Sequence, residues 1–227
     1  MRIILTIILA VLIGGGGVYT WLYYGGFAGE KDVAIAFIDA YGEYDEIALH
    51  VEALTHLPGT EGNADRAELQ SLLETVLTHD VTPERRDVLA RLAFQNLDTL
   101  KKEVDAAQSA QAKLYQNLQQ LDNAGRQFEG VQLRTQAGSI VTHARKRAEL
   151  SARITSVLSE TQDQTHAIIT QILEDKGELT SAHIQAINSA TAEAENRHDG
   201  LEVLYTEVLQ EKKDIETAFT QFIATAL

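Results

Sequence analysis

Apolar residues recur along this chain in alternating steps of three and four, and this 3.5-residue repeat constrains the fold more than any other feature. The repeat runs through 33–54, 93–121 and 184–222, and more loosely through 137–172. This spacing keeps one apolar stripe facing a partner helix and is typical of left-handed coiled-coil packing. The sequence therefore predicts an all-α fold of long helices that pack side by side.

The side chains of the stripe are expected to form either a core or an interaction surface. The repeat serves pairing within one chain and pairing between chains equally well, so both arrangements stay open. The predicted stripe residues are Phe37, Tyr44, Leu97, Leu100, Val104, Leu114, Leu118, Ile187, Leu201, Tyr205, Ile215 and Phe219. Polar residues also occupy inward positions of the repeat, where they either fix the register of the helices or line a ligand cavity or a wet subunit interface. They are Gln111, Thr161, Thr165, His198 and Lys212, with Arg147 and Ser151 if the looser repeat of 137–172 holds.

Helix-breaking residues divide the body of the chain into segments. A turn follows Leu57, Thr82 precedes a first-turn proline, and Gly177 separates the last two periodic segments. The predicted helices are 29–57, 64–79, 83–123, 127–176 and 179–226. Short connections favour antiparallel neighbours, so the expected architecture is an elongated, four-helix-like antiparallel bundle with coiled-coil packing. The alternative is a three-helix, spectrin-like rod whose first helix is a separate strut.

The N-terminus carries a second strong signal. Residues 3–24 contain no charge, and a helix needs about 20 such residues to cross a bilayer. Aromatic residues gather at the far end of the segment, where rings favour the headgroup region. The sequence predicts a transmembrane signal-anchor at 1–24, a Gly-rich linker at 25–29 and an extracytoplasmic domain at 30–227. The anchor residues singled out are Ile3, Leu9, Ile13, Gly14, Gly17, Tyr19, Trp21 and Tyr24.

A cleaved secretory signal is the alternative for the same segment, with residues 3–13 as its apolar region. Both interpretations place the body outside the cytoplasm. The expected location is the cytoplasmic membrane, with a single span, the N-terminus inside and the C-terminal domain periplasmic or extracellular.

Charge narrows the classes of partner. The chain has 33 acidic and 19 basic residues, for a formal net charge of −14, and no cysteine. An acidic body repels nucleic acid, so none is expected as a partner. The exception is the basic triplet, Arg145, Lys146 and Arg147, which is either a small docking patch or a face paired across helices.

Candidate residues for chemistry are sparse. Glu195 and His198 have the spacing of a di-iron bundle ligand pair, and Asp163 and His166 are its nearest echo, but the two pairs are expected about 15 Å apart along the bundle. His50 and His56 lie six residues apart, a spacing that does not place them on one helix face. His143 and His183 are isolated in the sequence. No phosphate loop, zinc-protease motif or nucleophile elbow occurs. The sequence therefore predicts no catalytic residue, no cofactor site and no metal site.

These observations favour a non-enzymatic, membrane-anchored scaffold or accessory protein that acts through helix-face packing outside the cytoplasmic membrane. Its expected partners are the membrane and other proteins of a membrane or envelope assembly, including copies of itself. The alternative is an extracytoplasmic four-helix-bundle module that senses a ligand and signals through a membrane partner. The sequence does not identify a small-molecule ligand.

Overall fold

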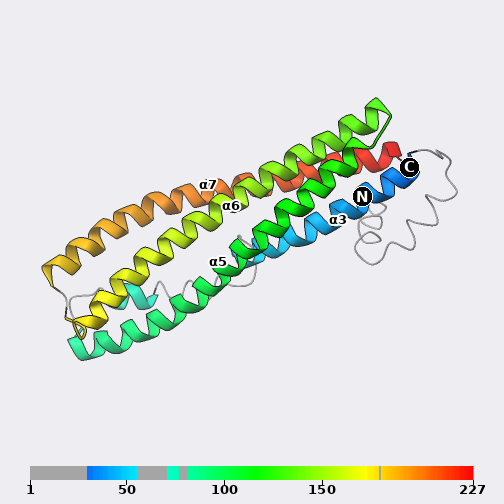
Figure 1. Cartoon of the computed structure of the whole chain (residues 1–227). Helices are drawn as coiled ribbons and strands as arrows, with labels where there is room; N and C mark the ends of the chain where they lie inside the picture. Colours follow the sequence, from blue (N-terminus) through cyan, green and yellow to red (C-terminus); the bar gives the residue numbers. More distant parts are fainter. Residues whose placement is uncertain (1–29, 56–70, 77–80, 179, 227) are drawn as a thin grey trace, which may run out of the picture. The chain divides into compact units, whose positions relative to one another are not determined.

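The computed structural model describes residues 30–55, 71–76, 81–178 and 180–226, and gives only the backbone at positions 187, 190, 191, 194–196 and 198. This part of the chain is all-α, with long, antiparallel packed helices. The long helices are α3 (Lys31–Leu54), α5 (Pro83–Arg126), α6 (Val131–Glu174) and α7 (Ser181–Ala226), and a short helical segment covers 71–76 (Figure 1). The ends of the four long helices lie within four residues of the predicted ones. Of the predicted helix 64–79, residues 71–76 are helical and the rest lies outside the described residues.

Local signals explain where α5 and α7 begin. The Thr82 hydroxyl accepts a hydrogen bond from the backbone N–H of Arg85 at 3.4 Å, and Pro83 occupies the first turn of α5. The Thr180 hydroxyl accepts from the N–H of His183 at 3.3 Å and caps α7 in the same way. These side chains satisfy backbone donors that have no partner within the helix.

The turn between α6 and α7 depends on two residues in the left-handed region. Lys176 has φ 54° and Gly177 has φ 80°. The N–H of Gly177 donates to the Ile172 carbonyl at 2.8 Å and closes the C-terminus of α6. A glycine adopts this conformation without the steric cost that a Cβ atom adds.

Two compact units make up the structure. The described parts of the first unit are 30–50, 110–150 and 207–226, and those of the second are 51–55, 71–76, 81–109, 151–178 and 180–206. Each of the four long helices contributes residues to both units. The two units are described separately below.

Helix directions in the first unit follow from its contacts. On α3 and α7, Phe37 contacts Phe222 and Tyr41 contacts Phe219, so the two helices run antiparallel. On α3 and α6, the Tyr44 hydroxyl donates to the Ala144 carbonyl at 2.7 Å, and the next residue, Asp45, pairs with Arg147. Partner numbers therefore rise together, and α3 runs parallel to α6.

Aromatic rings fill one end of the core of the first unit. Phe37, Phe128 and Phe222 are fully buried, and each pair of rings has its centroids 5.0–5.8 Å apart. Tilted and edge-on arrangements at these distances are favourable for aromatic pairs. Burying each phenylalanine contributes about 1.5–3 kcal/mol to folding. The three rings join α3, the α5–α6 connection and α7.

The second unit has its own apolar cluster. Its buried members come from 71–76, α5 and α6, and they are Val76, Ala90, Ala93, Leu97, Leu100, Ile169 and Ile172. Phe94 on α5 packs on His166 of α6 with centroids 4.6 Å apart, and Lys101 pairs with Asp163 on the same two helices. Partner numbers fall on α6 as they rise on α5, so these two helices run antiparallel.

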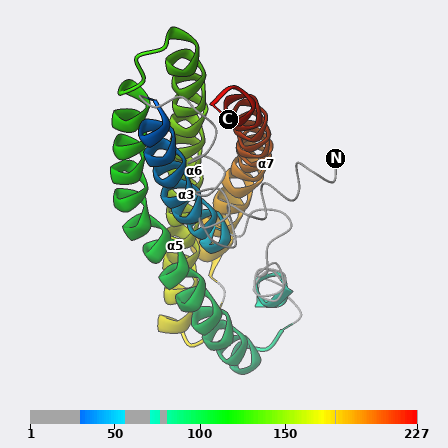
Figure 2. The ribbon, with the colours of Figure 1, turned by 90° about the vertical axis from the view of Figure 1, so that its right-hand side faces the viewer.

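A buried arginine ties three backbone segments of the second unit together. The Arg86 guanidinium donates to the carbonyls of Val76 at 2.9 Å, Gly177 at 2.8 Å and Val81 at 2.8 Å. These bonds fix the 71–76 segment and the α6–α7 turn against the first turns of α5. Figure 2 shows the ribbon of these segments from a second direction.

The predicted membrane anchor, 1–24, and the linker, 25–29, lie outside the described residues, and so do all eight anchor residues singled out above. Within the described ranges, no helix combines the length and the apolar character that a bilayer span requires.

Candidate functional site: a polar layer around the basic triplet

The basic triplet of α6 sends its three side chains to three different helices of the first unit. Arg145 lies 3.6 Å from Asp122 of α5, Lys146 lies 2.5 Å from Glu211 of α7, and Arg147 lies 2.6 Å from Asp45 of α3. Successive residues of an α-helix point about 100° apart, so three in a row can reach three neighbours. The triplet is therefore a face paired across helices.

The triplet and its three acidic partners form a polar layer, and Arg147 is its most deeply buried member. It is only 1 % exposed, and its partner Asp45 retains partial access to solvent. A buried charge destabilises the fold unless it is paired and hydrogen-bonded. The Arg147–Asp45 pair therefore favours one register of α6 against α3. Arg147 is also one of the polar residues that the repeat predicts to point inward, as is Ser151, which is buried in the second unit.

Tyr41 borders the same pair and stacks on Phe219 with centroids 4.3 Å apart. Burial raises the pKa of the Tyr41 phenol well above its ordinary value, and the nearby Asp45 carboxylate raises that pKa further, against a smaller opposing effect of Arg147. The phenol is therefore neutral throughout the physiological pH range.

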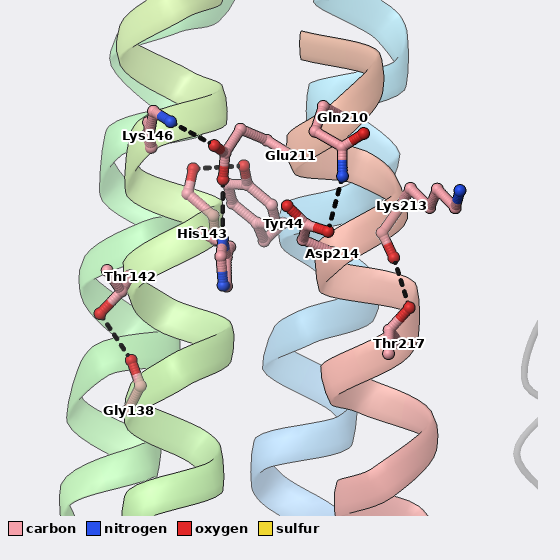
Figure 3. A network of polar contacts seen from close by, with 11 residues as sticks. Tyr44, Gly138, Thr142, His143, Lys146, Gln210, Glu211, Lys213, Asp214 and Thr217 are labelled. Atoms are coloured by element: carbon pink, nitrogen blue, oxygen red, sulfur yellow. Dashed lines mark hydrogen bonds and ion pairs between the residues drawn. The ribbon is translucent and has the colours of Figure 1, made fainter. Parts of the chain in front are cut away.

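The other half of the layer surrounds Glu211, whose side chain is 5 % exposed (Figure 3). His143 Nδ1 lies 2.7 Å from Glu211 Oε2, and Lys146 Nζ lies 2.5 Å from Glu211 Oε1. Burial alone would raise the pKa of Glu211, but the hydrogen bonds from Lys146 and His143 outweigh burial and lower it. Glu211 is therefore a carboxylate held in its ionised form between two helices.

Asp214 lies one turn along α7 from Glu211 and accepts a hydrogen bond from Gln210 at 2.8 Å (Figure 3). The groups of His143, Glu211 and Asp214 each offer one ligand atom, and these atoms lie within 4.8 Å of one another. In the described part of the chain, this is the group of residues whose geometry comes nearest to a metal site.

A shallow hollow lies on the α5–α6 side of the first unit. It encloses about 230 Å³ and is lined by Tyr115, Leu118, Gln119, Asp122, Arg145 and Glu149. Pockets for drug-sized ligands usually enclose about 300–1,000 Å³. The hollow is therefore too small and too open to enclose such a molecule.

Most of the predicted stripe residues are buried within the single chain. Leu201 and Phe219 are half-buried, and the side chain of Ile187 lies outside the described residues. The buried members are Phe37, Tyr44, Leu97, Leu100, Val104, Leu114, Leu118, Tyr205 and Ile215.

The repeat does not single out the most deeply buried polar residue of this part of α7. It predicts that Lys212 points inward, but Lys212 is half-buried and the preceding residue, Glu211, is buried instead. Val208, Glu211 and Ile215 also follow a three-then-four step, so the stripe on α7 is wide enough to include Glu211. Nothing in the sequence links Glu211 to His143, since only the antiparallel packing of α6 and α7 brings them together.

The fold and this polar layer define the class of the molecule as an antiparallel helical bundle with internally paired charges. Comparison of the chain with protein-family models, with curated proteins and with solved structures gave no match.

Proposed function

We propose that the protein is a non-enzymatic scaffold or accessory protein of a membrane assembly. In this proposal residues 1–24 anchor the chain in the cytoplasmic membrane, and the helical domain lies on the periplasmic or extracellular side. The membrane and other proteins of the assembly are its partners, and the outer helix faces make the protein contacts.

One observation carries the proposal. The apolar stripes that the sequence offers for helix pairing are buried inside a single chain, with Leu97 1 % and Leu114 0 % exposed. The basic triplet, the other candidate docking patch, is likewise engaged by Asp122, Glu211 and Asp45. Contacts with partners therefore depend on the outer surface, and self-association through the stripes is disfavoured.

Apolar side chains on the outer surface supply candidate contact points. Val88 and Leu92 are 57 % and 46 % exposed, and they lie one turn apart on the same face of α5. Large exposed apolar side chains that lie side by side are typical of protein contact surfaces. This face of the second unit is the first place to look for a partner.

Photo-crosslinking in native membranes tests this proposal. A photoreactive residue placed at position 88 or 92 of the full-length chain is expected to capture one recurring membrane or envelope protein. The matched control is position 108, an exposed glutamine on the same helix, which is expected to capture none. Equal labelling at all three positions, or no product at any exposed position, would contradict the proposal.

The location is tested separately by protease treatment of intact and opened cells. The domain after residue 30 is expected to be digested once the outer face of the cytoplasmic membrane is accessible, while the chain resists extraction by alkali. Protection of the domain until the membrane itself is opened would place it on the cytoplasmic side and overturn this part of the proposal.

A ligand-sensing module remains the second candidate function, and the ionised, buried Glu211 between two helices favours it. Because Glu211 of α7 contacts α6 through His143 and Lys146, binding of a cation to Glu211 would change how the two helices pack. A cation-dependent rise in the melting temperature of the full-length chain would support this second function.

A further inference from the structure

Three potential metal ligands face one another across α6 and α7 of the first unit. Glu211 and Asp214 lie one turn apart on α7, and His143 faces them from α6 (Figure 3). The Glu211 side chain is almost completely buried, whereas the His143 side chain is 34 % exposed. A bound ion would therefore be held by a buried carboxylate and remain accessible to solvent at the His143 side.

The charges near these three residues favour a cation. The Lys146 ammonium group contacts Glu211 and interacts electrostatically with Glu207 and Asp214 as well, so acidic groups outnumber this basic one. A buried carboxylate needs a positive or hydrogen-bonding partner, and Lys146 with His143 provides this for Glu211. Lys146 thus occupies the position that a metal cation would compete for.

We propose that His143, Glu211 and Asp214 form a binding site for a transition-metal cation of the Zn²⁺ class, which replaces Lys146 as the partner of Glu211. The inference goes beyond the scaffold function and does not depend on it.

The ligand set selects the class of ion. One imidazole nitrogen and two carboxylate oxygens suit Zn²⁺ and neighbouring first-row divalent metals, whereas Mg²⁺ and Ca²⁺ prefer sites made only of oxygen. Zinc binds such atoms at about 2.0–2.2 Å, which sets neighbouring ligand atoms about 3.3 Å apart in a tetrahedral site. The His143–Glu211 contact at 2.7 Å then opens slightly, and Asp214 closes in from within 4.8 Å.

Isothermal titration of the full-length chain in detergent micelles with Zn²⁺ tests the site. One ion is expected per chain, with no comparable binding of Mg²⁺. The His143→Gln and Asp214→Asn variants are each expected to bind about tenfold more weakly or worse. Lys146→Met removes the competing ammonium group and is expected to bind zinc more tightly than the wild type, an effect that a purely structural role of this cluster does not produce.

Two matched controls separate this site from adventitious binding at other histidines and carboxylates. His50 and Asp199 are exposed residues on α3 and α7, and His50→Gln and Asp199→Asn are expected to leave zinc affinity unchanged. The proposal is overturned if the wild type shows no stoichiometric binding, or if His143→Gln and Asp214→Asn bind as tightly as their controls. If His143→Gln fails to fold by circular dichroism, Asp214→Asn and Lys146→Met still decide the question.

Discussion

Arg147 Nη1 lies 2.6 Å from Asp45 Oδ1 and joins α6 to α3 across 102 residues of sequence. The arginine is buried and the aspartate is partly exposed, so the pair lies at the boundary between the core and the surface of the first unit. Its two neighbours in the triplet pair with α5 and α7. A three-residue segment of one helix thereby contacts all three of the other long helices.

Asp45→Asn removes the negative partner of Arg147 and leaves that charge buried. We expect the free energy of unfolding to fall by about 3 kcal/mol, measured by chemical denaturation of the full-length chain in detergent. The double variant Asp45→Asn with Arg147→Met replaces the pair by uncharged groups and should recover most of this loss. A double variant less stable than Asp45→Asn alone would contradict this assignment of Arg147.

Leu100 tests the apolar cluster of the second unit, where it is 4 % exposed. Leu100→Asp buries a charge without a partner, and we expect it to abolish cooperative thermal unfolding. Thr99→Asp, at the exposed neighbouring position on α5, provides the control and should retain the melting transition. If Leu100→Asp kept the helicity and melting temperature of the wild type, the stripe on α5 would be assigned incorrectly.

Gly177 tests the α6–α7 turn. At its φ of 80°, an added Cβ would lie 2.1 Å from the Pro83 carbonyl oxygen, so Gly177→Ala forces the turn away from α5. The left-handed conformation alone costs a non-glycine residue about 1–2 kcal/mol, and displacement of the turn adds to that loss.

The matched control for Gly177 lies in the middle of α7. Nothing lies within 4 Å of a Cβ added at Gly200, so Gly200→Ala should stabilise the chain by about 0.5–1 kcal/mol through helix propensity. We therefore expect Gly177→Ala to lower the melting temperature and Gly200→Ala to raise it. Equal effects of the two substitutions would show that the turn does not need a glycine.

Tyr41 gives the chain a specific response to alkaline pH. Because its pKa is raised in the folded state, the folded chain retains a proton that the unfolded chain releases above a pH of about 10. The contribution of Tyr41 to stability is therefore complete below that pH and declines as the pH rises further. Tyr41→Phe removes this ionisation, so the unfolding free energy of the variant should decline less steeply above pH 10 than that of the wild type. An unchanged slope would contradict the burial of this phenol.

The four long helices could be predicted from the sequence, because the repeat marks their length and local signals set several of their ends. Thr82 and Pro83 start α5, and Gly177 lies in the turn between α6 and α7. Leu97 and Leu114, which belong to the predicted stripe, are buried in the structure. These features depend on residues close together in the sequence, where spacing and propensity are informative.

The candidate site depends on packing between distant segments, and the sequence did not predict it. His143 appeared isolated because its partner Glu211 is 68 residues away. The basic triplet allowed two interpretations, and only the positions of Asp45, Asp122 and Glu211 on three other helices show that its charges are paired within the first unit.

The most direct test of the central claim asks whether the helices pair within one chain. The natural chain has no cysteine, so Lys101→Cys with Asp163→Cys introduces a single pair across α5 and α6, at a contact present in the structure. A short bis-maleimide should join this pair within one full-length chain in detergent, with a yield that does not change on dilution, while either single variant gives no intrachain product. Covalent dimers as the main product, declining on dilution, would show that the stripes pair between chains and would contradict the account.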